Sequence, residues 1–167
     1  MQELEFFHAT IDELPEIVAI YNSTISSRMV TADLEPVSVE SRLAWFHEHD
    51  PMRRPLWAVK DKDQQIVGWA SFQSFYGRPA YNGTVEVSVY LHAQQRGKGI
   101  GKQVLAFCIA QAPRYGIKTL LGYIFAHNEP SLKLFAQQGF EVWARLPNIA
   151  ELDGIERTLL ILGKRVA

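Results

Sequence analysis

The sequence predicts an α/β (α+β) fold, with a mixed, mostly antiparallel central sheet of about seven strands flanked by helices on both faces. In the middle of the chain, strand patterns follow one another as a meander, and after it strands alternate with helices. The chain has 167 residues, of which 47% are hydrophobic, so it can build one sizeable core. We therefore expect residues 1–167 to form a single domain.

The first part of the chain predicts one strand and two helices. Residues 4–8 read as a strand, and the helix after it carries Leu14, Ile17, Val18 and Tyr21 at helical spacing. Asp12 is the expected N-cap, since Pro15 then falls in the first turn, where a missing N–H costs little. Residues 22–36 show no period and predict a loop. A second helix is expected over residues 38–49, with Val39, Leu43 and Phe46 facing inward.

The remaining elements follow from alternation and punctuation. Strands are expected over residues 56–60, 66–75 and 83–91, with the polar turn 61–65 between the first two. A helix then ends near Tyr115 and Gly116, residues 119–125 form a strand, and residues 130–138 form a helix capped by Gly139. Two final strands are expected over residues 141–145 and 155–162.

The junction after the third of these strands carries the strongest chemical signal. Residues 84–91 alternate, which places Glu86, Ser88 and Tyr90 on the face opposite the valines. Next comes the segment QRGKGIG (residues 95–101), where glycines at a helix N-terminus can turn backbone N–H groups into one concavity. Such a loop is suited to bind an anion such as a phosphate, although a solvated basic turn has the same composition.

The spacing of the glycines excludes two known phosphate-binding motifs and fits a third. In the dinucleotide fingerprint a third glycine would stand where the chain has Lys102. In the Walker motif Gly97 and Gly101 are one residue too close, and Gln103 replaces the required hydroxyl. The loop does fit R/Q-x-x-G-x-G/A, with Arg96, Gly99 and Gly101 in the fixed places. This resembles the pyrophosphate-binding motif of the GNAT acyl-CoA N-acyltransferases.

Composition limits the class of partner. The net charge is −1 and the pI is near 6.5, so no global basic field attracts nucleic acid or an anionic membrane. One cysteine excludes an internal disulfide framework and a cysteine-based zinc site, and Cys108 lies on an apolar helical stripe. His47 and His49 do not share a helical face, so we expect no metal site. With no leader or membrane-length apolar run in the sequence, a cytoplasmic location and a small-molecule partner are expected.

The resemblance extends over nearly the whole chain. The stretches TADLEP, RLAWF, GRPAYNGTVEVSVY, QRGKGIG and HNEPSLKLFAQQGF resemble, in order, the phosphinothricin and methionine sulfoximine N-acetyltransferase group. The resemblance implies a GNAT-like fold and transfer of an acetyl group from acetyl-CoA to the α-amine of a small amino-acid analogue such as phosphinothricin, methionine sulfoximine or methionine sulfone. Two alternatives stay open: another acceptor amine (a protein N-terminus, an aminoglycoside or a polyamine), or a non-catalytic acyl-CoA sensor.

The resemblance also implies how acetyl-CoA is bound. The pantetheine arm would pair with the backbone of Val89, Tyr90 and Leu91, where an N–H would also polarise the thioester carbonyl. Asn128 matches an asparagine that contacts this arm, but it fits equally well as a plain helix N-cap before Pro130. The pyrophosphate would be bound by the loop residues Arg96, Gly97, Lys98, Gly99, Ile100, Gly101 and Lys102.

Glu86 is the candidate catalytic residue. An amine must lose a proton before it attacks a thioester, and its α-amino pKa is about 8 in water, so a carboxylate acting directly or through water supplies the base. On sequence alone, an exposed strand carboxylate is the commoner case; the resemblance favours the base. Where many relatives have a tyrosine or histidine acid, this chain has Phe135, which has no proton to give. Water, Tyr90 or His127 could protonate the thiolate, and nothing in the sequence ranks them.

The acceptor side is expected from the loop before the Glu86 strand. The resemblance makes this loop one wall of the substrate site, with Arg78 as the cation that grips a carboxylate or phosphinate; a solvated loop arginine is the alternative. Thr31 and Glu35 are expected to close over the site. The substrate-binding candidates are therefore Phe75, Tyr76, Gly77, Arg78, Tyr81, Val87, Ser88 and Thr31.

A homodimer is also expected. Members of the group commonly pair through a two-fold interface, which is an argument by analogy. The last third of the chain is more apolar than one terminal hairpin should expose. The apolar residues concerned are Trp143, Leu146, Ile149, Leu152, Ile155, Leu159 and Ile161.

Overall fold

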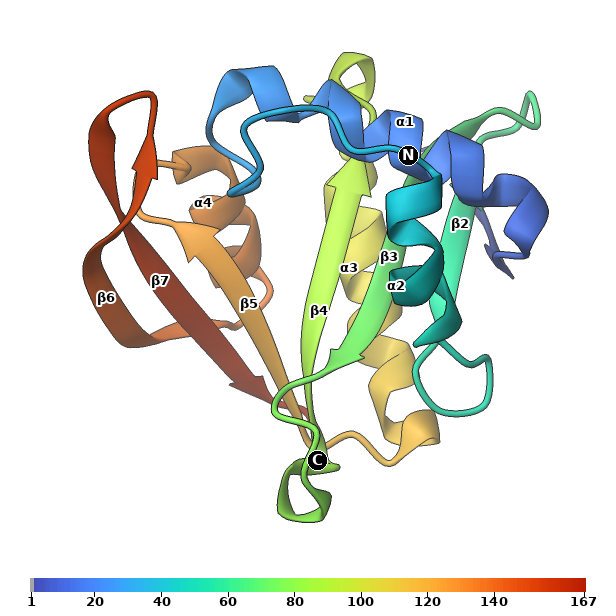
Figure 1. Ribbon diagram of the computed structural model, residues 1–167. Coiled ribbons are helices and arrows are strands. Elements are labelled where there is room, and N and C mark those ends of the chain that lie inside the picture. The colour runs from blue at the N-terminus through green and yellow to red at the C-terminus, as the bar shows by residue number, and fades with distance from the viewer. Residues whose placement is uncertain (1) are drawn as a thin grey trace.

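The computed structural model describes residues 2–167 and contains one seven-stranded sheet of order β1-β2-β3-β4-β5-β7-β6 (Figure 1). Within residues 2–167 only the β4–β5 pair is parallel, so the predicted mixed, mostly antiparallel sheet is confirmed. The strands are β1 (Glu5–His8), β2 (Leu56–Lys60), β3 (Ile66–Ser74), β4 (Thr84–Leu91), β5 (Thr119–Phe125), β6 (Glu141–Leu152) and β7 (Ile155–Arg165).

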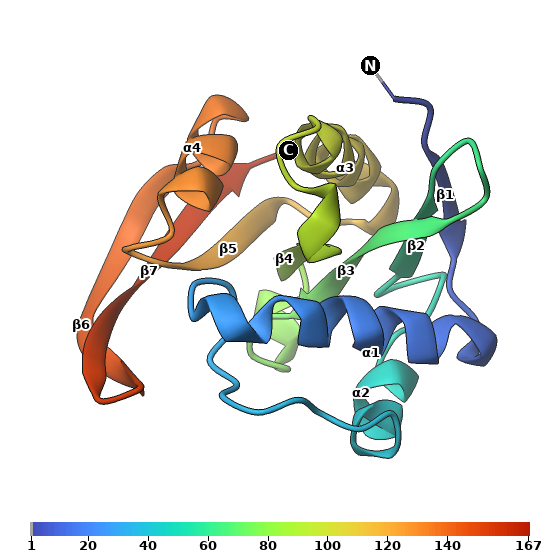
Figure 2. The ribbon, with the colours of Figure 1, turned by 90° about the horizontal axis from the view of Figure 1, so that it is seen from above.

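Helices cover both faces of the sheet, as predicted. Figure 2 shows α1 (Leu14–Ser23) and α2 (Leu43–His47) on one face, and α3 (Ile100–Gln111) and α4 (Glu129–Gln137) on the other. The larger core lies under α3 and α4, and a smaller cluster of Ile17, Ile20, Leu56 and Trp69 lies under α1 and α2. No helix within residues 2–167 combines the length and apolarity that a membrane crossing needs.

The N-terminal cap differs from the prediction. Thr10, not Asp12, caps the 3₁₀ turn Ile11–Glu13 that leads into α1: its Oγ1 accepts from the Asp12 N–H at 3.3 Å, and its own N–H donates to Glu13 Oε1 at 2.7 Å. Thr10 and Glu13 have the T-x-x-E spacing of a capping box, which explains the correction. Pro15 does lie in the first turn of α1.

The second predicted helix is shorter than expected and has a different inner face. A 3₁₀ turn, Glu40–Arg42, precedes the five-residue α2. Leu43, predicted inward, is 38% exposed, whereas Trp45 and Phe46 pack against the smaller cluster. A 3₁₀ turn has 3.0 residues per turn rather than 3.6, so it shifts the phase of the helical face that follows.

Strands β4 and β5 separate after a short contact. Their pairing covers Thr84 to Glu86, and β4 then continues to Leu91 without β5 beside it. The His92 N–H donates to Val67 on the β3 side, and the β3–β4 register is uninterrupted. Because successive N–H groups alternate between the two edges of a strand, those of Val89 and Leu91 face the gap. This edge of β4 therefore offers backbone groups without a strand partner within residues 2–167.

The C-terminal hairpin is longer than predicted. β6 and β7 run on to a turn at Asp153 and Gly154, both with positive φ, the Asp-Gly signal of a tight hairpin. The side chains of Val142, Trp143, Ile149 and Ile155 are 49–59% exposed. In Figure 2 no helix covers the hairpin on the side of α1 and α2. Leu152, by contrast, is buried by its own chain.

Candidate active site

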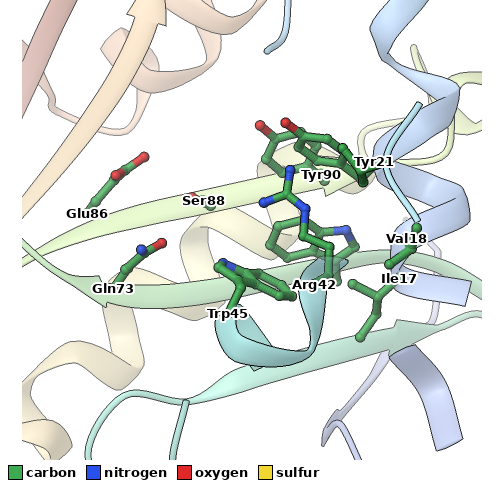
Figure 3. Close-up of a pocket in the computed structure, with 11 residues that line it drawn as sticks. Ile17, Val18, Tyr21, Arg42, Trp45, Gln73, Glu86, Ser88 and Tyr90 are labelled. Carbon is green, nitrogen blue, oxygen red and sulfur yellow. The ribbon is translucent and has the colours of Figure 1, made fainter. Parts of the chain in front are cut away.

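A cavity of about 210 Å³ lies between α1, α2 and strands β3 and β4; we call it the Glu86 cavity (Figure 3). Glu86 stands beside Gln73, its cross-strand neighbour on β3. Burial raises the pKa of the Glu86 carboxyl above its ordinary value of 4.5. A half-buried carboxylate with a raised pKa at the wall of a cavity is suited to take a proton. The cavity is lined by Ile17, Val18, Tyr21, Val37, Arg42, Trp45, Trp69, Gln73, Glu86, Ser88 and Tyr90.

Aromatic rings form one end of this cavity. Tyr90 stacks on Trp69 with centroids 4.6 Å apart, Trp45 meets Trp69 edge-on at 5.3 Å, and Tyr21 lies 5.2 Å from Tyr90. Burial raises the pKa of the Tyr90 hydroxyl far above its ordinary value, and electrostatic interaction with Tyr21 and Glu86 raises it further. Tyr90 therefore stays protonated at neutral pH.

A polar network stands behind Tyr21. Its hydroxyl is bonded to Thr31 and donates to Asp33, and burial followed by the Asp33 bond raises the pKa of Tyr21. Arg42 Nη2 donates to Asp33 Oδ2 at 3.0 Å. Thr31, a predicted substrate contact, is thus buried and bonded to Tyr21 rather than lining the cavity, while Glu35 is exposed.

A second cavity, of about 260 Å³, lies at the glycine loop; we call it the loop cavity. Gly97 and Gly99 have φ of 76° and 78°, and Gly99 is the N-cap of α3. Within residues 2–167, no backbone N–H from Gly97 to Lys102 donates to another residue. These are the unsatisfied amides of a helix N-terminus, and the basic residues Arg96 and Lys102 lie beside them. Lys98 is exposed and reaches back to Gln95 at 3.4 Å instead of lining the cavity.

A third, smaller cavity of about 70 Å³ joins the other two where β4 and β5 separate. It shares Glu86, Ser88 and Tyr90 with the Glu86 cavity, and Val89, Tyr90 and Phe135 with the loop cavity. Val87 also lines it. The structure thus brings the predicted base, the predicted strand segment and the predicted anion loop onto one continuous path. At the end of this path away from Glu86, the loop cavity is lined by Leu91 and by all the predicted loop residues except Lys98.

Two residues of the predicted site have roles inside the fold. Asn128 caps α4 by accepting from the Ser131 N–H at 3.3 Å, and its Nδ2 donates to the Met29 carbonyl at 3.1 Å. Asn128 is therefore the N-cap of α4, one of the two roles expected from the sequence. It also lines the smallest of the three cavities, and its contact with a pantetheine arm stays a prediction. Tyr90 turns its own N–H toward β3, because of the alternation above, and meets the cavities through its ring.

The structure offers no side-chain acid at the position of Phe135. This ring is buried over Gly122, where an added Cβ would lie 2.6 Å from Cε2. His127 is held by a 2.8 Å bond between Nε2 and the Arg28 carbonyl, and does not line the three cavities. Tyr123, which the sequence reasoning missed, lines the smallest cavity together with Glu86.

The loop between β3 and β4, predicted as a wall of the substrate site, contributes no residue to the lining of the Glu86 cavity. Phe75, Tyr76 and Tyr81 pack on one another with centroids 5.6–6.0 Å apart, and Gly77 and Arg78 are exposed. The lining of that cavity stops at Gln73 on β3. The reason is geometric: the loop joins the strand ends that point away from α1 (Figure 1). A substrate contact by this loop stays a prediction.

Several lining residues were not identified from the sequence. Arg42, Trp45 and Gln73 come from three different elements that only the folded sheet brings together. The segment RLAWF was noted for its resemblance, but nothing in its spacing indicates that Arg42 faces a cavity. Among residues 2–167, no group of three or more His, Cys, Asp or Glu side chains could hold a metal ion.

Strands β4 and β5 separate beside the glycine loop, and the half-buried carboxylate of Glu86 lies where they separate. The resemblance to acyl-CoA N-acyltransferases implies this arrangement. The family model described as the acetyltransferase (GNAT) family matches residues 17–140. The chain belongs to this family and is an acyltransferase.

Individual proteins are similar over most of the chain. YwnH of Bacillus subtilis (strain 168), named provisionally as a phosphinothricin acetyltransferase, is 50% identical over 93% of this chain and 94% of its own length. An L-methionine sulfoximine/L-methionine sulfone acetyltransferase of Pseudomonas paraeruginosa (strain PA7) is 32% identical over 87% and 85% of the two chains. The structure of YncA from Salmonella typhimurium, with acetyl-CoA, has a TM-score of 0.90 and 25% identity, covering 99% and 95% of the two chains.

Proposed function

We propose that the protein transfers an acetyl group from acetyl-CoA to the α-amine of a small amino-acid analogue such as phosphinothricin, methionine sulfoximine or methionine sulfone. The observation that carries this proposal is the position of Glu86, whose half-buried carboxylate lies at the junction between the Glu86 cavity and the gap in the sheet. The names of the relatives support the acceptor class.

The loop cavity fits a pyrophosphate. Six consecutive free N–H groups and two basic side chains form the donor set, and the positive φ of Gly97 and Gly99 turns this backbone in a way that other residues rarely adopt. The free edge of β4 at Val89 and Leu91 fits the amides of a pantetheine arm, which would add to the sheet as a strand does. Acetyl-CoA bound in this way supplies the acetyl thioester.

Glu86 then performs the proton transfer. Its carboxylate takes a proton from the acceptor's ammonium, directly or through a water, so that the neutral amine can attack the thioester carbon. An N–H on the free edge of β4 stabilises the negative charge that develops on the carbonyl oxygen. The leaving thiolate needs no strong acid, because a thiol pKa of about 8.5 makes it a tolerable leaving group. A phenylalanine at position 135 is compatible with this scheme.

The size of the Glu86 cavity favours a small acceptor. A volume of about 210 Å³ suits one amino-acid-sized molecule rather than an aminoglycoside. A non-catalytic sensor would have no use for a desolvated carboxylate at this place. Release of free thiol from acetyl-CoA, measured with each of the three named acceptors, tests the proposal; no turnover above background with any of them would refute it.

We also propose that two copies form a homodimer through the exposed apolar face of β6 and β7. The half-exposed ring of Trp143 lies directly against Gly163, so the hairpin presents a broad apolar surface that its own chain leaves open. A second copy would cover it.

Cys108 is free and buried on α3, which fits a reducing compartment, and we place the reaction in the cytoplasm.

A further inference from the structure

The Glu86 cavity has one positively charged side chain, Arg42, among the described residues that line it. We propose that Arg42 binds the α-carboxylate of the acceptor and so directs its amine along β4 toward Glu86. The inference rests on the proposed function and makes it more specific: the acceptor must carry a carboxylate next to its amine.

Arg42 has hydrogen-bond donors to spare. Its Nη2 bond to Asp33 is the one hydrogen bond that its guanidinium makes within residues 2–167. Arg54 is different: it donates to Ser74 Oγ and to the carbonyls of Asn82 and Arg53. Arg28 likewise donates hydrogen bonds to Asp153 and to two backbone carbonyls. A guanidinium carries five N–H donors, so Arg42 retains enough for a bidentate carboxylate.

The free donors of Arg42 are held in a fixed orientation. Asp33 fixes one side of the guanidinium, and the Tyr21 ring lies 4.6 Å from its central carbon. Asp33 is itself held by the Tyr21 hydroxyl. Only 26% of the Arg42 side chain is exposed, and Figure 3 shows its guanidinium pointing into the space next to the rings of Tyr21 and Tyr90. A fork that is already oriented loses less conformational entropy when it binds an anion.

The two charges lie at opposite ends of one row. Glu86, Ser88 and Tyr90 share a face of β4 at intervals of about 6.6 Å, with Arg42 at the Tyr90 end. An α-amino acid bound with its carboxylate at Arg42 holds its amine on the Ser88 side of the guanidinium, from where a water can carry the proton to Glu86. An acceptor turned the other way would bring its ammonium toward the guanidinium, where the two positive charges repel each other. The cavity therefore selects both the orientation and the presence of the carboxylate.

Arg78, the cation expected from the resemblance, lacks these features. It is exposed, it precedes the short turn Pro79–Tyr81, and it does not line the Glu86 cavity. The two arginines thus give opposite expectations for the same experiment.

The test compares methionine sulfone with its carboxamide, which keeps the amine and the side chain but has no carboxylate. The wild type should prefer the carboxylate form by at least tenfold in kcat/KM. Arg42→Gln should raise KM for methionine sulfone by about 10- to 100-fold, the range expected for lost hydrogen bonds to a charged group, and should remove the preference. KM for acetyl-CoA should not change. Arg42→Lys should keep part of the preference, because it keeps the charge but loses the fork.

Arg114→Gln is the matched control, an exposed arginine whose bond is to Gln111 in its own helical segment. Binding of both compounds, followed by the fluorescence of Trp45 and Trp69 in the cavity wall, gives the same comparison without turnover. Absence of turnover in the wild type would refute the proposed function, but the binding preference would still test Arg42. The inference is overturned if wild type binds both compounds equally, if Arg42→Gln keeps the preference, or if Arg78→Gln removes it.

Discussion

Replacing Glu86 by glutamine should remove the base while keeping the shape of the cavity. Loss of a general base costs about 10²- to 10⁴-fold in rate. The lower part of this range is expected at pH 7, because an α-amine with a pKa of about 8 is already about one-tenth neutral without help. As the pH rises from 7 to 9 the neutral fraction grows about tenfold, so the defect of Glu86→Gln should shrink by about the same factor.

The assay is kcat/KM for the acceptor between pH 5 and 9. Burial raises the pKa of Glu86 above 4.5, so the wild-type rate should fall on the acid side as the carboxylate becomes protonated, at a pH higher than an exposed glutamate would give. Glu86→Gln should lose this acid limb and bind acetyl-CoA normally. A variant with wild-type rate, or with the acid limb intact, would show that another group is the base.

Stability provides a control on the same variant. A carboxyl whose pKa is raised in the fold binds its proton more tightly when folded, so its contribution to stability is present below the ordinary pKa of 4.5 and is lost as the pH rises through the folded pKa. At neutral pH the buried charge is a cost, and Glu86→Gln should melt at the same temperature as the wild type or higher. A lower melting temperature at pH 7 would mean that the charge is stabilised by a partner.

Three further outcomes are expected. Gly99→Ala, at φ 78°, should cost about 1 kcal/mol of stability and weaken acetyl-CoA binding at least tenfold by calorimetry; an unchanged Kd would contradict the anion loop. Gly122→Ala should cost about 1–3 kcal/mol in denaturant unfolding because its Cβ would meet Phe135, and Phe135→Leu in the same chain should recover part of that loss rather than add to it. Trp143→Glu should give a mass near 19 kDa by light scattering while Met52→Glu, at an exposed apolar residue outside the hairpin, leaves the mass near twice that; a wild type already near 19 kDa would refute the dimer.

The sheet was predictable because its strands carry local signals. The strands at 56–60 and 119–125 have the predicted bounds, since alternation or a continuous apolar run is enough to mark them. The inner face of α2 was not predictable from a 3.6-residue period, because the 3₁₀ turn before it shifts the phase. The capping box at Thr10 and the Asp-Gly turn at Asp153 are both visible in the sequence. The prediction instead placed the cap at Asp12 and ended the strand before the turn at residue 145.

The candidate site divides in the same way. The loop residues and Glu86 lie within one continuous segment, so sequence alone could place them at one junction. Arg42, in the 3₁₀ turn, and Trp45, in α2, reach the same cavity from about forty residues earlier, by contacts that depend on how these two elements pack across β3. The loop with Arg78 joins the ends of β3 and β4 that carry Gln73 and Glu86, yet none of its residues lines the cavity. Distance along the chain was a poor guide here.

The central claim is tested most directly by incubating the protein with acetyl-CoA and methionine sulfone and following the product by mass spectrometry together with the release of free thiol. We expect one N-acetylated product per thiol released, a strong dependence on Glu86, and no reaction when the amine is already blocked. Thiol release without an acetylated amine, or acetylation that Glu86→Gln leaves at the wild-type rate, would contradict it.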